Sequence, residues 1–159
     1  MPTNKQGLLT LLLVFGLFSG CSSEDDPIAF SKEDYLIFGH FYGMCVGERC
    51  VETYKLTSTE LYADQLDDYS GQSFEFQELS KDEFEQTKDL LDDFPRALLE
   101  EEDNFIGCPD CADGGGLFIQ YVRKGKVKSW RIDQNKNNIP EYLHDFVDKV
   151  NAKIAALIE

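Results

Sequence analysis

Hydrophobic and polar residues alternate along several short segments of this chain, with the two-residue period that half-buried β-strands show. The segments with this period are 34–42, 51–56, 60–63, 74–77, 117–122 and 127–132. Residues 57–59 and the pair Lys124-Gly125 are typical of turns, so the two flanking pairs of segments should form β-hairpins. Within 34–42 the alternation places Leu36 and Phe38 on one face of the strand and Ile37 on the other.

Two other segments follow a helical period. Ser80 and Glu83 match the capping box that opens many helices, and Pro95 should end the helix that follows. A last helix should begin near Pro140 and bury an apolar stripe made of Leu143, Phe146, Val147, Val150, Ile154 and Leu157. These elements predict an α+β domain, in which an antiparallel sheet of about five strands carries the middle helix and the amphipathic C-terminal helix on one face.

The N-terminus has the features of a secretory signal: Lys5, an apolar run over 8–18, and small residues before Cys21. That run has 11 residues, and a bilayer-spanning helix needs roughly 20. A cysteine at this point resembles a lipobox, although Phe18 stands where leucine is usual, and it predicts lipidation of Cys21. We therefore expect a signal peptide over 1–20, a tether over 21–31 and one globular domain over 32–159.

The predicted lipid indicates a place in the cell envelope, and the acidic run described next, unless it is only a polar tether, indicates a Gram-negative bacterium. The acidic run 22–26 resembles a tag that directs lipoproteins to the outer membrane and its outer surface. The formal net charge is −15, and losing Lys5 with the signal makes it −16. Such a charge repels phosphate backbones, so nucleic acid is not an expected partner, and attachment to the membrane should come from the lipid. Cationic ligands, divalent metals and basic protein surfaces are the partners that this charge favours, and the alternative is that the charge serves only solubility. The 12 Phe and seven Tyr indicate a packed core.

Four cysteines remain after Cys21, spaced as two close pairs: Cys45 with Cys50, and Cys108 with Cys111. An even number in an exported chain predicts two disulfides, with three pairings open. A four-thiolate zinc site is an alternative, because two residues between cysteines is ligand spacing. A redox role for the Cys-Pro-Asp-Cys motif is another, although glycines and a strand follow it rather than the helix that activates such thiols.

Other residues suggest weaker sites. Asp133, Asn135 and Asn137 supply oxygens at the alternate positions of a calcium loop, but Asn138 stands in place of its glycine and His144 in place of its final glutamate. The alternative is an Asn-rich turn before a helix. His40 is the only other histidine, and the sequence places no nucleophile beside either histidine. We expect no catalytic residues and no cofactor, and hence no enzyme.

The run 38–56, together with Gly107-Cys108-Pro109-Asp110-Cys111, resembles an uncharacterised family of small bacterial lipoproteins. The resemblance covers most of the chain after Cys21 and implies no known activity. The C-terminal half is similar in its hydrophobic pattern to protease inhibitors of the emfourin type, which share a strand–turn–strand, a proline and an amphipathic helix. These similarities favour a non-enzymatic binding module for a protein partner, with an exposed aromatic patch near Phe41-Tyr42 or Phe105-Ile106. A thiol or zinc protein and a calcium-stabilised domain are the alternatives.

Overall fold

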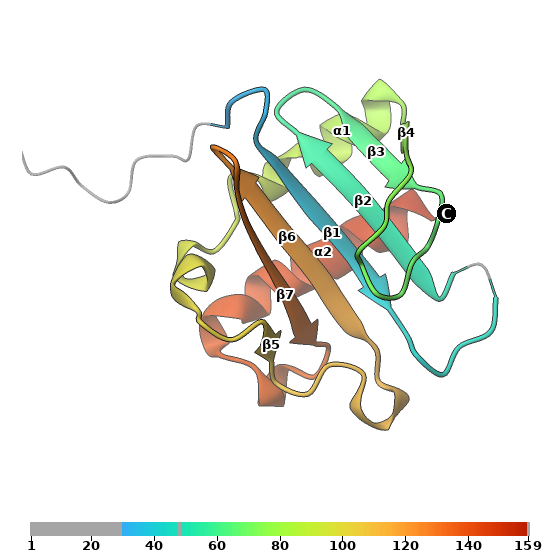
Figure 1. Cartoon of the computed structure of the whole chain (residues 1–159), viewed down its shortest axis with the longest axis vertical. Coiled ribbons are helices and arrows are strands. Elements are labelled where there is room, and N and C mark those ends of the chain that lie inside the picture. The colour runs from blue at the N-terminus through green and yellow to red at the C-terminus, as the bar shows by residue number, and fades with distance from the viewer. Residues whose placement is uncertain (1–29, 48, 159) are drawn as a thin grey trace, which may run out of the picture.

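The fold is α+β, with a seven-stranded sheet covered on one face by helices (Figure 1). The structure is a computed structural model that describes residues 30–47 and 49–158. The predicted signal peptide and Cys21 lie outside these residues. The strands run in the order β4-β3-β2-β1-β6-β7-β5. Their bounds are β1 Tyr35–Phe41, β2 Val51–Thr57, β3 Leu61–Asp64, β4 Phe76–Glu78, β5 Phe105–Ile106, β6 Gly116–Arg123 and β7 Lys126–Asp133.

The sheet is larger than the predicted one, and it is mixed rather than purely antiparallel. All neighbouring strands are antiparallel except β5, which pairs with β7 in parallel. This strand has only two residues, too few to show any alternation, and it is held at the sheet edge by a bond from Arg131 N to the Asn104 carbonyl. Strand β4 begins at Phe76, two residues later than expected, because its register is set by pairing with Asp64.

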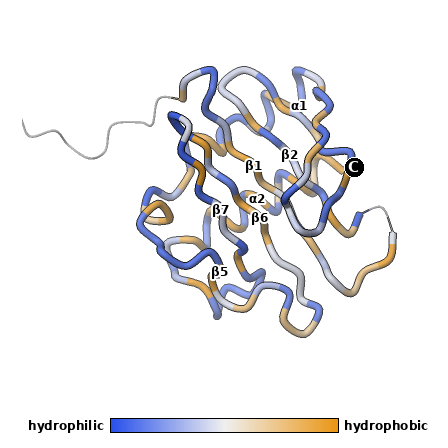
Figure 2. Tube along the Cα trace, viewed as in Figure 1, coloured by the Kyte–Doolittle hydropathy of each residue, from blue (hydrophilic) through white to orange (hydrophobic). Residues whose placement is uncertain are grey.

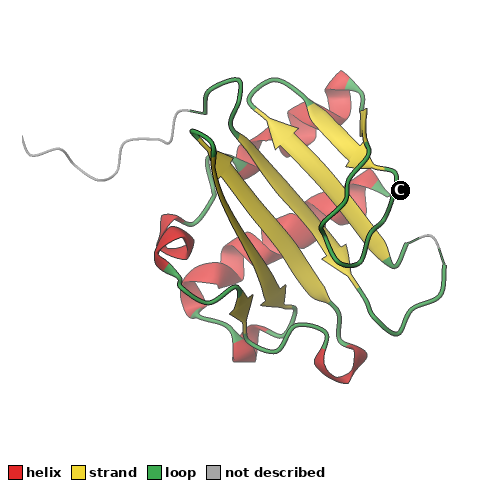
Figure 3. Cartoon of the chain, viewed as in Figure 1, coloured by secondary structure: helices red, strands yellow, loops and turns green. Residues whose placement is uncertain are grey.

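Helices α1 and α2 lie across one face of the sheet, and short 3₁₀ turns lie in the connections (Figure 3). The helices are α1 (Lys81–Thr87) and α2 (His144–Leu157), and the turns are η1 (Lys88–Leu90), η2 (Arg96–Glu100), η3 (Cys111–Asp113), η4 (Lys136–Asn138) and η5 (Glu141–Leu143). The predicted stripe of α2 is confirmed: Leu143, Phe146, Val147, Val150 and Ile154 are buried against the sheet. Apolar residues concentrate where the strands and α2 meet (Figure 2).

Helix α1 is short because its end is fixed by side chains. The capping box is present, with Ser80 accepting from the Glu83 amide and Glu83 accepting from the Ser80 amide. One turn later the hydroxyl of buried Thr87 donates to the Glu83 carbonyl at 2.8 Å, and the chain continues as the 3₁₀ turn η1. The segment still reaches the core, because Leu90 is fully buried.

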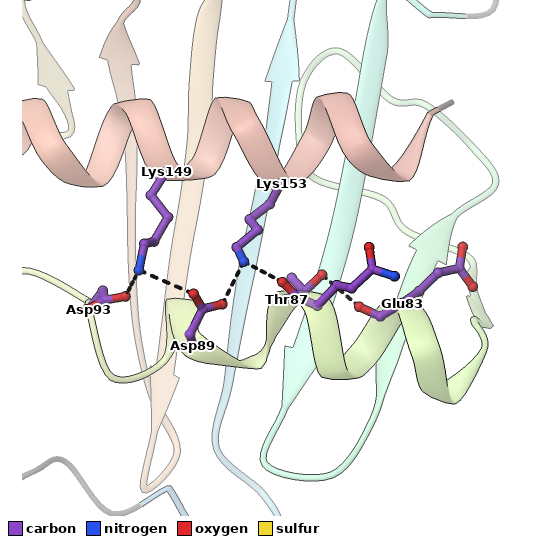
Figure 4. Close-up of polar contacts among 7 residues, drawn as sticks. Glu83, Thr87, Asp89, Asp93, Lys149 and Lys153 are labelled. Atoms are coloured by element: carbon purple, nitrogen blue, oxygen red, sulfur yellow. Dashed lines mark hydrogen bonds and ion pairs between the residues drawn. The ribbon is translucent and has the colours of Figure 1, made fainter.

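Polar contacts join α2 to the segment that follows α1 (Figure 4). Lys149 pairs with Asp89 at 3.2 Å and also with Asp93, and Lys153 pairs with Asp89 at 2.9 Å. All four side chains are partly exposed, so water screens these pairs. Each pair is therefore expected to add less than about 1 kcal/mol, and the apolar contacts beneath them hold α2 in place.

The other face of the sheet is only partly covered. A loop over residues 65–75 crosses it and packs Phe74 against Phe118, with the rings 6.1 Å apart. The residues beneath form a second, smaller core of Ile37, Phe41, Val51 and Phe118. The predicted division of the first strand into two faces is thus confirmed. Within the described part of the chain, no helix has the length and apolar character needed to cross a membrane.

Asp34 fixes the start of β1 to the turn between β6 and β7. Its side chain is 2 % exposed, and it accepts hydrogen bonds from the amides of Ser31 and Lys124, both at 2.8 Å. Burial alone would raise the pKa of Asp34, but these bonds and the charge of Arg123 lower it below its usual 3.8. A carboxylate with a lowered pKa stabilises the fold above its unfolded-state pKa, and this contribution is lost as the pH falls through the folded-state pKa.

We therefore expect Asp34→Asn to reduce stability at pH 7 and to weaken the loss of stability on acidification below about pH 4. Urea unfolding of the variant and the parent chain at neutral and acidic pH measures both effects. Glu33→Gln removes the same charge from an exposed neighbour and serves as the control. Equal acid sensitivity in Asp34→Asn and Glu33→Gln would contradict this role of Asp34.

Candidate functional site at the disulfide-bonded loops

Three loops meet at the end of the sheet where β1 finishes and β6 begins: 42–50, 65–75 and 107–115. The first contains a disulfide between Cys45 and Cys50, with Cα atoms 5.6 Å apart, and the third contains one between Cys108 and Cys111, with Cα atoms 5.5 Å apart. The prediction of disulfides is confirmed, and of the three possible pairings the chain adopts the one that consists of two short bridges. Each bridge shapes its own loop and links no distant segments.

Asp110, between the two cysteines of the third loop, holds the three loops together. Its Oδ2 accepts from the Gly43 amide and from the Tyr69 hydroxyl, both at 2.9 Å. Its Oδ1 accepts from the amide of Gly115 at 3.1 Å, and its own amide donates to the Gly115 carbonyl at 2.7 Å. Burial would raise the pKa of Asp110, but these bonds and the charge of Arg131 lower it. The group is therefore an anion at neutral pH, and charged acceptors form the stronger hydrogen bonds.

Arg131 closes the 65–75 loop over the sheet. Its guanidinium lies 4.3 Å from the centre of the Phe41 ring and 5.1 Å from that of Tyr69, and it donates to the Tyr69 carbonyl. The Phe41 and Tyr69 rings meet edge to face at 5.4 Å. A cation against aromatic faces adds about 0.5–2 kcal/mol per contact. Arg131 and Asp110 thus hold Tyr69 from opposite ends, by its carbonyl and by its hydroxyl.

Asp133 supports the third loop from below. Its carboxylate is 6 % exposed and accepts from the Cys108 amide at 2.9 Å, the Asn135 amide at 2.8 Å and the Asn138 side chain at 2.7 Å. Gly107 allows this approach, since it has a φ of +76° and an added Cβ would lie 2.7 Å from the Cβ of Asp133. In the structure these oxygens face N–H donors, the arrangement of an Asn-rich turn. The calcium hypothesis gains no support from it.

The loops leave large apolar side chains in solvent. Met44 is 80 % exposed, Val46 is fully exposed and Phe105 on the neighbouring edge strand is 65 % exposed. Leu66 and Tyr69 of the covering loop are about half exposed. The expectation of an exposed Phe105 is confirmed, but that for Phe41 is wrong: Phe41 is 2 % exposed because the Tyr69 and Arg131 side chains cover it.

Among the described residues, the ring of each histidine contacts a backbone carbonyl. His40 Nε2 lies 3.2 Å from the Arg49 carbonyl, and burial lowers the pKa of His40 while that contact opposes the shift. His144 Nε2 lies 3.3 Å from the Ile139 carbonyl. Across residues 30–47 and 49–158 no three His, Cys, Asp or Glu side chains are grouped as metal ligands would be.

The Cys108–Cys111 disulfide is exposed but lacks the surroundings that activate a thiol. Only a three-residue 3₁₀ turn follows, and the Cys108 amide, which could stabilise a thiolate, donates to Asp133. The carboxylate of Asp110 lies between the cysteines in sequence and would disfavour a second negative charge. The geometry therefore favours a structural role for this bridge over redox chemistry.

Sequence reasoning found the cysteines but missed Asp110, Met44 and Val46. Asp110 contacts residues 67 and 41 positions away, and such contacts leave no trace in local spacing. Val46 could have been found, because an apolar residue between two closely spaced cysteines has no core to enter, and Met44 lies directly before the first of them.

We expect Asp110→Ala to loosen the loops without unfolding the sheet. The amide hydrogens of Gly43 and Gly115 should exchange with solvent about tenfold faster or more, because each loses a bond to a charged acceptor. Hydrogen exchange read by NMR measures this. Asp113→Ala, an exposed acid on the same loop, is the matched control. Unchanged exchange at Gly43 in Asp110→Ala would show that Asp110 does not tie the loops.

Comparison of the chain with known protein families and with curated proteins finds no family model that matches it and no curated protein that matches it. The case for a function therefore depends on the geometry of the loops.

Proposed function

We propose that this protein is a non-enzymatic, lipid-anchored binding module of the bacterial cell envelope, which recognises a protein partner through the three tied loops. The signal-like N-terminus and Cys21 support the anchor and the outer-membrane location. The disulfides support an oxidising compartment. The recognition surface consists of Met44, Val46, Leu66, Tyr69 and Phe105.

The observation that carries the proposal is the combination of exposed apolar side chains with a fixed backbone. A soluble domain rarely leaves a methionine 80 % exposed beside a fully exposed valine without a partner for them. Two disulfides and the Asp110 bonds hold these loops in place before binding. Ordering loops on binding weakens affinity, so loops that are already ordered favour tight recognition.

The charge on the same loops indicates the kind of partner. Asp67, Asp68 and Asp113 lie on them, and the whole chain has 30 acidic residues against 15 basic ones. A partner surface with an apolar centre and a basic rim would complement this arrangement. A protease inhibitor, as the hydrophobic pattern of the C-terminal half suggests, is one form that such a module takes.

A photo-crosslinking amino acid at position 46 of the full, membrane-anchored chain tests the proposal. We expect a discrete protein adduct in intact cells, and at least about tenfold less of it when Met44→Asp is added, because burying a charge at the centre of an interface is costly. The same probe at position 155, exposed on α2, is the control. Identical adducts from positions 46 and 155, or an adduct indifferent to Met44→Asp, would refute the proposed surface.

A further inference from the structure

The opposite end of the sheet holds a pocket rich in positive charge. The pocket has a volume of about 310 Å³ and lies between the β6–β7 hairpin and η2. It is lined by Tyr121, Leu99, Arg123, Lys124, Lys126 and Lys128. Hydrophilic residues dominate this hairpin turn in Figure 2. Four of the 15 cations of a chain with net charge −15 thus surround one pocket. In the sequence, the run 123–128 already has four cations and no acidic residue. The negative net charge of the whole chain hides this local positive charge.

Two buried polar atoms at this pocket form no hydrogen bond of good geometry with any residue that the structure describes: the Tyr121 hydroxyl and Arg123 Nε. Tyr121 is 4 % exposed, and its ring is fixed by stacking on Phe94 at 4.5 Å and by an edge contact with Phe30 at 5.5 Å. An unpaired buried hydroxyl is costly, and native structures rarely keep one without a reason. Burial raises the pKa of Tyr121, and the charge of the neighbouring Arg123 and the approach of its side chain to the hydroxyl both act against this rise. The hydroxyl is therefore protonated and can donate, with Arg123 as its neighbour in the pocket.

The cations also lack acidic partners. Within the described residues, Arg123, Lys124, Lys126 and Lys128 take part in none of the ion pairs, which all involve other lysines. Lys128 instead donates to the Leu99 carbonyl. The buried carboxylate of Asp34 lies near Arg123, but its oxygens accept from the amides of Ser31 and Lys124. Positive charge, a hydroxyl donor and a free guanidinium nitrogen therefore converge on one space.

The place of the pocket in the fold connects it with the N-terminal segment. Phe30, which packs on Tyr121, follows the predicted lipid-bearing Cys21 by nine residues. Nine residues span at most about 30 Å, so an anchored domain would keep this end near the bilayer. Val127 at the hairpin turn is 59 % exposed among these cations. An apolar side chain flanked by lysines is typical of surfaces that contact lipid headgroups.

We propose that this pocket binds a phosphate group, carried either by a lipid headgroup or by a free phosphorylated molecule. The lysines and Arg123 supply the charge, and the Tyr121 hydroxyl and Arg123 Nε donate to phosphate oxygens. This site lies at the other end of the sheet from the loop surface, and phosphate binding there does not depend on the partner proposed for that surface; only its nearness to a bilayer rests on the proposed lipid anchor.

The test uses the full chain with Cys21→Ser, which cannot be acylated, in every sample. The first probe is inorganic phosphate, compared with chloride at equal ionic strength, with the unfolding midpoint as the readout. We expect phosphate to raise the midpoint. In K126Q/K128Q the apparent affinity should fall more than tenfold. K81Q/K88Q removes two lysines from the α1 region and is the matched control.

Tyr121→Phe separates binding from folding. It keeps the ring contacts with Phe94 and Phe30 and removes only the unpaired hydroxyl, so a purely structural role predicts unchanged or slightly higher stability and unchanged phosphate affinity. We expect normal stability with about fivefold weaker phosphate binding. The control K81Q/K88Q gives the reference affinity for phosphate. If K126Q/K128Q and Tyr121→Phe both bind phosphate as tightly as this control, the proposed site is wrong.

Vesicles distinguish the two sources of phosphate. If the source is a headgroup, vesicles of phosphatidylcholine with phosphatidylglycerol should bind the parent chain more tightly than pure phosphatidylcholine, and K126Q/K128Q should lose this preference while K81Q/K88Q keeps it. If inorganic phosphate binds through the pocket but vesicle binding ignores the pocket substitutions, the site is supported and its ligand is a soluble phosphorylated molecule.

Discussion

Replacing Gly39 with alanine is expected to destabilise the fold by about 3 kcal/mol or more. Gly39 lies in β1, the central strand, opposite Thr53 of β2 and Phe118 of β6. A Cβ added at this glycine would overlap the Glu52 carbonyl oxygen and lie 2.9 Å from the Cα of Thr53. These are backbone atoms of the paired strand, which cannot rotate away as a side chain could. The strands would have to separate at the centre of the sheet.

Urea unfolding of Gly39→Ala measures this loss of stability. Gly114→Ala is the matched control, because Gly114 has ordinary helical dihedrals and an added Cβ would meet only the Cys111 carbonyl, at 3.2 Å. We expect the control to change the free energy of unfolding by about 0.5 kcal/mol or less. A similar loss in both variants would mean that the close approach of β1 and β2 at Gly39 is not the source of the effect.

Asp133→Ala is expected to cost about 3 kcal/mol and to release the loop that carries the second disulfide. The substitution leaves the Cys108 amide, the Asn135 amide and the Asn138 side chain without their acceptor. Each bond to a charged acceptor is worth about 1.5–3 kcal/mol, and water can replace part of that loss because the loop is near the surface. The exchange of the Cys108 amide hydrogen should rise together with the loss of stability.

Acidification should loosen the loop that carries the second disulfide, but less than Asp133→Ala does. Burial would raise the pKa of Asp133, but its three bonds lower it below its usual 3.8, so its contribution is lost as the pH falls through this lowered value. Exchange of the Cys108 amide measured near pH 7 and near pH 3, relative to its intrinsic rate, reports this loosening. Added calcium provides a further check: a melting temperature of the parent chain that rises with calcium, and does not rise in Asp133→Ala, would restore the calcium hypothesis.

Much of the fold could be predicted because local patterns decide it. The alternation of 34–42 defined the two faces of β1, and Lys124-Gly125, with φ values of 50° and 73°, forms the expected hairpin turn. The sequence could not reveal β5, since Phe105–Ile106 is a strand only because β7 lies beside it. Helix α1 gives way to a 3₁₀ turn after Thr87, whose hydroxyl bonds back to the Glu83 carbonyl four residues earlier, a local bond that threonine makes only in some helices.

The candidate site was predicted only in outline. The cysteines pointed to the right loops, yet the residue that unites the loops is Asp110, which the sequence presents as an ordinary spacer between two cysteines. Phe41 was expected near an exposed patch, but the loop that carries Tyr69, 28 residues later in the chain, folds back to cover it. Contacts of this kind arise from the path of the loops, which hydrophobic periodicity does not describe.

The position of β1 also determines when the chain can fold. This strand is made early, yet one of its two edges pairs with β6, where Tyr35 lies opposite Val122, and α2 at the C-terminus packs against it. Contacts this distant in sequence form late and slowly. A translation product that stops before Gly116 therefore leaves an edge of β1 open and its apolar face bare, a form prone to aggregation and to proteolysis. Cellular quality control should consequently find either complete, folded molecules or fragments to degrade, with no stable half-domain between them.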